Sequence, residues 1–182
     1  NAEIENYLST HYEFRYNTVL GRPEFRGKND AHFSKVGRNE INTLRRELDN
    51  DVGIITSSDN LYSIIESSFS PRVNPIQEYF KRLPLVDVSS SSPFSLKAIH
   101  ELASCVVVRN SNKWLPYLIK WPVAVVANAM DNRECSNHTC LVLTGEQGKF
   151  KTTFLDSLCP PKLHGYSYTD KIYPQEKDTL TY

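Results

Sequence analysis

The sequence predicts a mainly helical α+β protein: an N-terminal β-hairpin with helices, a helical connector, and a strand–loop–helix unit that opens an α/β domain. Three observations predict this class. Aromatic and charged residues alternate near the N-terminus, and apolar residues recur at helical spacing through most of the chain. Near residue 150, a glycine-containing turn joins a short apolar run to a Lys-Thr pair.

Length and composition are those of an ordinary globular protein. The 182 residues suffice for one or two domains, and the 21 basic and 21 acidic residues give no formal net charge. This balance disfavours a strongly basic nucleic-acid-coating protein but allows a local basic patch. No apolar run approaches the ~20 residues of a membrane span, and the four cysteines form no Cys-x2-Cys pair. We therefore expect a cytoplasmic protein with reduced thiols and no membrane partner.

A β-hairpin is expected over residues 12–26. Residues 3–10 form a short helix or an ordered lead-in, and residues 12–16 then alternate in the manner of a half-buried strand. Gly21-Arg22-Pro23 is the turn signal. The arginines Arg15, Arg22 and Arg26 mark either a phosphate-contacting face or a solvated polar face.

Three helices are expected after the hairpin. Ile41, Leu44 and Leu48 repeat at helical spacing, and the polar run at 49–53 ends that helix. Ser58 or Asp59 caps the second helix, and Asn74-Pro75 opens the third, which Pro84 stops. A hairpin with such helices permits a winged-helix-like DNA reader. The candidate nucleic-acid-binding residues in that arrangement are Arg38, Arg45 and Arg46.

The serine-rich stretch at residues 87–93 is the expected linker between an N-terminal accessory region, 1–86, and a second region, 94–182. Apolar residues recur at helical spacing from Phe94 to Val106 and predict a helix. Residues 114–127 are apolar almost all round, which predicts a buried helix with Pro116 in its first turn and a kink at Pro122.

Residues 140–155 resemble a phosphate-binding loop between a strand and a helix. The apolar run at 140–143 predicts a buried strand, and the residues after Lys151 predict the first turns of a helix. In the pattern G-x-x-x-x-G-K-[ST], Gly145, Lys151 and Thr152 have the required spacing, and Phe150 replaces the second glycine. Aligning Gly148-Lys149 instead leaves Phe150 where the pattern needs a hydroxyl.

The loop supplies the candidate site residues. Lys151 is the candidate catalytic residue because its charge would hold the β- and γ-phosphates, and the Thr152 hydroxyl would ligate Mg²⁺. The candidate nucleotide-binding residues are Gly145, Glu146, Gln147, Gly148, Lys149, Phe150, Lys151, Thr152 and Thr153. The structural alternative is a plain glycine turn leading into a helix.

Three segments resemble the virulence-associated protein E family. They are Asn-Pro-Ile-Gln-Glu-Tyr-Phe at 74–80, the paired Lys-Trp at 113–114 and 120–121 with Ala-Val-Val-Ala at 124–127, and Leu-Thr-Gly-Glu-Gln-Gly…Lys-Thr-Thr-Phe-Leu at 143–155. Members of this family are primase/helicase-type P-loop ATPases of phages, plasmids and other mobile elements. The resemblance covers roughly residues 70–182 and is most specific at the last segment.

The resemblance implies a parent protein that uses ATP with Mg²⁺, acts on DNA and assembles as a homo-oligomeric ring. In the family an acidic Walker B strand and an arginine finger come later than this chain extends. We therefore expect a piece of a longer bacterial protein, a monomer or weak dimer that binds a nucleotide phosphate without turnover alone. The alternatives are a non-catalytic nucleic-acid-binding or assembly module with a degenerate loop, and a structural domain without a ligand.

Overall fold

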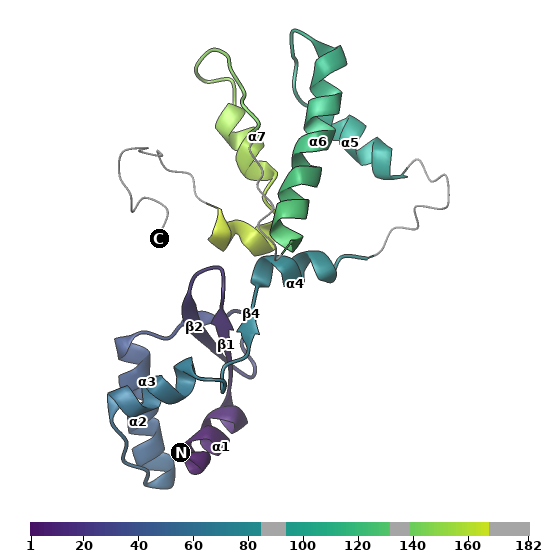
Figure 1. Cartoon of the computed structure of the whole chain (residues 1–182). Coiled ribbons are helices and arrows are strands. Elements are labelled where there is room, and N and C mark those ends of the chain that lie inside the picture. The colour runs from purple at the N-terminus through teal and green to yellow at the C-terminus, as the bar shows by residue number, and fades with distance from the viewer. Residues whose placement is uncertain (85–93, 132–138, 168–182) are drawn as a thin grey trace. The chain divides into compact units, whose positions relative to one another are not determined.

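The computed structural model describes residues 1–84, 94–131 and 139–167 of the chain. Its mainly helical α+β class confirms the expectation from the sequence. The chain divides into two compact units, the first holding Asn1–Glu78 and the second beginning at Tyr79. Figure 1 shows the elements of each unit. The predicted linker at 87–93 lies outside the described residues.

The first unit contains a four-stranded sheet in the order β3-β2-β1-β4. Helix α1 (Ala2–His11) leads directly into β1 (Tyr12–Asn17), which pairs antiparallel with β2 (Arg22–Gly27), so the predicted hairpin is confirmed. Two short strands were not predicted. The strand β3 (Ser34–Lys35) is antiparallel to β2, and β4 (Arg72–Val73) is parallel to β1.

The three helices predicted after the hairpin are present as α2 (Arg38–Val52), α3 (Ser58–Glu66) and α4 (Pro75–Lys81). Helix α2 runs past the predicted break at residue 49. It ends where Gly53 adopts a left-handed conformation, φ 67°, and donates its N–H to the carbonyls of Leu48 and Asp49. Ser57 caps α3 by accepting a hydrogen bond from the N–H of Asn60 at 3.1 Å.

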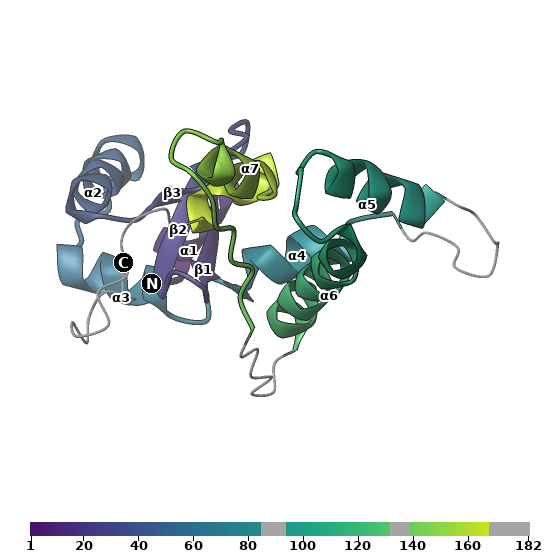
Figure 2. The same ribbon diagram turned by 90° about the horizontal axis from the view of Figure 1, so that it is seen from above.

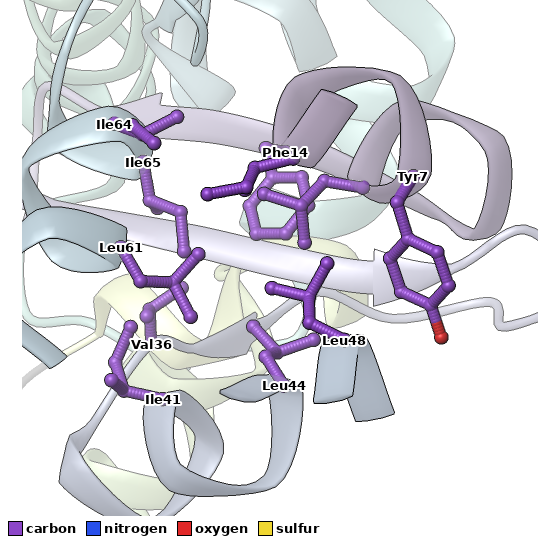
Figure 3. Close-up of a cluster of buried hydrophobic side chains, with 11 residues drawn as sticks. Tyr7, Phe14, Val36, Ile41, Leu44, Leu48, Leu61, Ile64 and Ile65 are labelled. Carbon is purple, nitrogen blue, oxygen red and sulfur yellow. The ribbon is translucent and has the colours of Figure 1, made fainter. Parts of the chain in front are cut away.

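One hydrophobic cluster holds the first unit together (Figure 3). It takes side chains from α1, β1, α2 and α3, so the helices are held against one face of the hairpin. Its buried members are Ile4, Tyr7, Leu8, Phe14, Val36, Ile41, Leu44, Leu48, Leu61, Ile64 and Ile65. The helical stripe predicted from Ile41, Leu44 and Leu48 is therefore a core stripe.

Two tyrosines fasten α1 and β1 to α2 at the edge of this cluster. The Tyr7 hydroxyl donates to Asp51 Oδ2 at 2.5 Å, and the Tyr12 hydroxyl donates to Glu47 Oε2 at 2.6 Å. Burial, and then the hydrogen bond to Asp51, raises the pKa of Tyr7 to about 12. Burial and the bond to Glu47 raise the pKa of Tyr12 as well.

The second unit contains helices α5 (Phe94–Ser104), α6 (Ser111–Met130) and α7 (Lys151–Ser157) and the 3₁₀ helix η1 (Pro161–Tyr166). Helices α5 and α6 lie side by side (Figures 1 and 2), and the Trp114 indole N–H donates to the Ala103 carbonyl at 3.0 Å. None of the helices in the described parts of the chain has the length and apolarity to cross a membrane.

The prediction that α6 is a buried helix is wrong. It is helical as expected, but Leu118 is its only buried residue, and Tyr117 and Val123 are 58% and 64% exposed. The described part of the second unit has too few neighbouring elements to cover a helix that is apolar on every side. Periodicity reports which residues are apolar, not how many elements surround them.

The predicted buried strand before the glycine turn is also not formed. Residues 139–146 have no regular secondary structure, Cys140 is exposed, and Val142 is 69% exposed. A strand needs a partner for its backbone N–H and C=O groups. The described residues of the second unit contain no other strand that could supply one.

We expect Leu44→Ala to lower the unfolding free energy of the first unit by about 2–5 kcal/mol, because it leaves a cavity in the core. Val52→Ala is the control on the same helix, since Val52 is 49% exposed, and should change stability by about 0.5 kcal/mol or less. Urea unfolding followed by far-UV circular dichroism measures both. Equal losses in the two variants would contradict the assignment of the core.

The tyrosine–carboxylate bonds predict a loss of stability at alkaline pH. The unfolded chain releases its tyrosine protons near pH ~10, whereas Tyr7 keeps its proton to about pH 12. The stabilisation is therefore complete below pH ~10 and is lost as pH rises through about 12.

The measurement is the urea midpoint across this alkaline range. Tyr7→Phe should show a smaller decline than the wild type, and Tyr117→Phe, which removes an exposed hydroxyl in α6, should decline as the wild type does. An unchanged decline in Tyr7→Phe would refute the role given to its hydroxyl.

Candidate functional site

The glycine-containing turn folds as a tight loop immediately before α7. Three of its residues have positive φ: Gly145, with φ 154°, Gly148, with φ 78°, and Phe150, with φ 53° and ψ 22°. Phe150 is the only non-glycine residue with positive φ in the described parts of the chain. It stands where the phosphate-loop pattern has its second glycine, and its backbone adopts a positive φ that glycine adopts without strain.

Phe150 is 79% exposed. An aromatic residue at positive φ carries a conformational cost of roughly 1–2 kcal/mol. Phe150 at this position therefore strains the backbone at the start of α7.

Lys151 folds back over the loop that precedes it. Its Nζ donates to the Gly145 carbonyl at 3.0 Å and to the Glu146 carbonyl at 2.5 Å. A second lysine, Lys149, forms an ion pair with Glu146, with 3.6 Å between Nζ and Oε2. The Lys151 ammonium is therefore held at the start of the loop by the carbonyls of Gly145 and Glu146.

The start of α7 offers unpaired N–H donors. The first N–H groups of a helix have no intrahelical partner, and Phe150, as the residue before the helix, provides no side-chain cap. The N–H groups of Lys151, Thr152 and Thr153 make no hydrogen bond to another described residue. Several N–H donors and one ammonium beside one another are the groups that bind phosphate.

The candidate nucleotide-binding residues share this one loop, but they take different places in it. Gly145, Glu146 and Lys151 are in direct contact, and the ion pair adds Lys149. Gln147 and Thr153 are exposed and make no side-chain contact to another described residue. The Glu146–Lys149 ion pair was not predicted from the sequence. The spacing of three residues between opposite charges could have indicated it.

Thr152 meets the simplest requirement for the predicted magnesium contact, since it is exposed in the first turn of α7. No group of three or more His, Cys, Asp or Glu that could hold a metal ion occurs among the described residues. A magnesium ion at Thr152 would therefore need its other oxygen ligands from phosphates and water.

The candidate nucleic-acid-binding arginines differ in their surroundings. The Arg45 guanidinium is committed within the fold: Nε donates to the Thr56 carbonyl at 2.8 Å and Nη1 to Ser58 Oγ at 3.1 Å. Arg38 and Arg46 are exposed and form no ion pair or hydrogen bond with a described residue. Arg45 and Arg46 line one hollow, to which Arg38 does not belong.

The hairpin arginines are paired with carboxylates on the outer face of the sheet. Arg15 binds the buried Glu24 through Nε and Nη2, at 3.0 and 2.7 Å from Oε2, and Arg22 approaches the same carboxylate at 3.6 Å. Arg26 binds Glu13 through Nε and Nη2, at 2.8 and 2.6 Å. A phosphate would have to compete with these carboxylates, so the polar-face alternative accounts better for the hairpin arginines.

Comparisons of the chain with protein-family models, with curated proteins and with solved structures each gave no match. The resemblance to the virulence-associated protein E family therefore rests on the quoted segments alone.

The positive φ of Phe150 predicts that backbone strain and side-chain size affect the stability of α7 separately. Phe150→Gly and Phe150→Ala both remove the exposed ring, but only glycine relieves the left-handed strain. We expect Phe150→Gly to stabilise the start of α7 by about 1 kcal/mol relative to Phe150→Ala. Native-state hydrogen exchange of the α7 amides measures this difference, and equal protection in the two variants would contradict it.

Proposed function

We propose that the chain binds a nucleotide through the phosphate-binding loop formed by residues 145–153. The observation that carries this proposal is the position of the Lys151 ammonium, which lies on the carbonyls of Gly145 and Glu146 inside the loop. This contact keeps the ammonium next to the loop instead of extended into solvent. In a phosphate-binding loop the corresponding lysine reaches the β- and γ-phosphates that the loop holds.

The chemistry of the loop favours phosphate over a carboxylate or a neutral ligand. A phosphate group has several oxygens that accept hydrogen bonds in different directions, and the loop offers N–H groups together with one full positive charge. The pattern spacing from Gly145 to Thr152 is that of loops that hold the β-phosphate. We therefore assign the diphosphate part of a nucleotide as the group recognised.

The roles proposed for individual residues follow from their places. Lys151 would neutralise the phosphate oxygens, and the N–H groups of Thr152 and Thr153 would donate to them. The Thr152 hydroxyl would be a ligand of a magnesium ion that enters with the phosphates and lowers their mutual repulsion. Binding, and not turnover by the chain alone, is the activity we propose, because hydrolysis also needs a water-positioning group and an arginine beside the γ-phosphate.

The wider setting that we propose rests on the family resemblance. In that setting the loop belongs to a primase/helicase-type ATPase of a mobile element, which works on DNA in the bacterial cytoplasm as a homo-oligomeric ring. The loop geometry supports the nucleotide part of this proposal only.

We expect millimolar Mg-ADP to raise the thermal unfolding midpoint of the second unit. A ligand at ~100 times its dissociation constant adds roughly 2.7 kcal/mol to stability. Tryptophan fluorescence follows this unit, because Trp114 and Trp121 both lie in α6. Lys151→Ala should abolish the shift because it removes the charge at the centre of the loop.

Lys162→Ala is the control for this measurement, since Lys162 is an exposed lysine in the nearby η1 helix. It should leave the shift unchanged. A shift that appears only in Phe150→Gly would mean that the side chain of Phe150 hinders the nucleotide. No shift in the wild type or in Phe150→Gly would refute the proposed function.

A further inference from the structure

A hollow of about 240 Å³ lies on the first unit between α2 and the segment that leads to α3. Its lining residues are Asn42, Arg45, Arg46, Asp49, Ile55 and Thr56. The four from α2 are spaced by three and four residues and so form one stripe on the helix. This stripe is separate from the core stripe, and the proposed phosphate-binding loop makes no use of it.

The hydrogen bonds of Arg45 fix the shape of the hollow. Its bonds to the Thr56 carbonyl and the Ser58 hydroxyl, at 2.8 and 3.1 Å, tie the connecting segment to α2. Ser58 also donates to Asn42 Oδ1 at 3.4 Å. The wall formed by residues 55 and 56 is therefore held at a fixed place beside the helix.

Three groups in the lining remain available to a partner. Arg46 and Asp49 are exposed, and neither makes an ion pair or a side-chain hydrogen bond with a described residue. Ile55 is 86% exposed, although its neighbour Ile54 packs on the core. One free cation, one free anion and one exposed aliphatic side chain thus line the same hollow.

This combination fits a peptide better than the other common ligands. A nucleic-acid backbone is bound by several free cations, but Arg45 is committed and the Asp49 carboxylate would repel phosphates. Pockets for small molecules usually measure ~300–1,000 Å³, which is larger than this hollow. A peptide can offer a carboxylate, an aliphatic side chain and a backbone N–H within two or three residues.

We propose that the hollow docks a peptide segment of a partner protein in which an acidic residue adjoins an aliphatic one. The acidic side chain pairs with the Arg46 guanidinium, which presents several donors to a carboxylate. The aliphatic side chain covers Ile55, and a backbone N–H of the peptide donates to Asp49. The ion pair with Arg46 and the hydrogen bond to Asp49 together fix the direction of the segment.

The test uses the whole chain and three labelled peptides. The cores of the peptides are Leu-Glu-Leu, Leu-Gln-Leu and Ser-Glu-Ser, each within the same glycine–serine flanks. Fluorescence anisotropy should show that Leu-Glu-Leu binds at least about five times more tightly than either of the other peptides. Leu-Gln-Leu lacks the carboxylate that pairs with Arg46, and Ser-Glu-Ser lacks the aliphatic side chain that covers Ile55. Arg46→Ala and Ile55→Ser should each weaken that binding by a similar factor.

Matched controls come from the same unit. Lys35→Ala removes an exposed cation outside the hollow, and Val52→Ser removes an exposed aliphatic side chain of α2 outside it. Both should bind Leu-Glu-Leu as the wild type does. Circular dichroism of each variant confirms that the fold is intact, as expected for exposed positions.

Three results would overturn the proposal. The first is no binding of Leu-Glu-Leu at millimolar concentration, or equal weakening in the controls. The second is an oligonucleotide that binds through Arg46 more tightly than any peptide, which would assign the hollow to nucleic acid. The third is dimerisation in sedimentation experiments that Ile55→Ser abolishes, which would make a second copy of the chain the occupant.

Discussion

The first unit depends on the burial of one face of the β1–β2 hairpin beneath α2 and α3. Burying a leucine contributes about 1.5–3 kcal/mol, and Leu44, Leu48 and Leu61 are at most 1% exposed. The exposed ion pair on the outer face, Arg26 with Glu13, contributes at most about 1 kcal/mol. The apolar face therefore decides that the unit folds. The outer face, where buried Glu24 needs Arg15 and Asn17 as partners, favours one strand register over others.

The sequence predicted the first unit well because its signals are local. A turn at Gly21, a leucine stripe at helical spacing and the Asn74-Pro75 start each determine structure within a few residues. The strands β3 and β4 could not be predicted, because two residues carry no periodicity and each strand exists only through its neighbour in the sheet. The end of α2 was misplaced by a few residues, since Gly53 outweighs the polar run before it.

The second unit was predicted less well than the first. Its helices were predicted, but the burial expected for α6 and for the run before Gly145 was not found, because burial needs partners from elsewhere. The loop itself was found from spacing alone. Spacing could not predict that Lys151 would bond to the carbonyls of Gly145 and Glu146.

Phe150 bears on the proposal that residues 145–153 bind phosphate, because it stands where the pattern has its second glycine. Glycine serves two purposes at that place: it adopts positive φ without strain, and it leaves room for the phosphate. At Phe150 the backbone has the positive φ, 53°, and the residue is 79% exposed. The strain is present whether or not a ligand is bound, so it lowers the stability of the loop and not its affinity. A hindrance to phosphate by the side chain of Phe150 would be a separate effect, which lowers the affinity and not the stability.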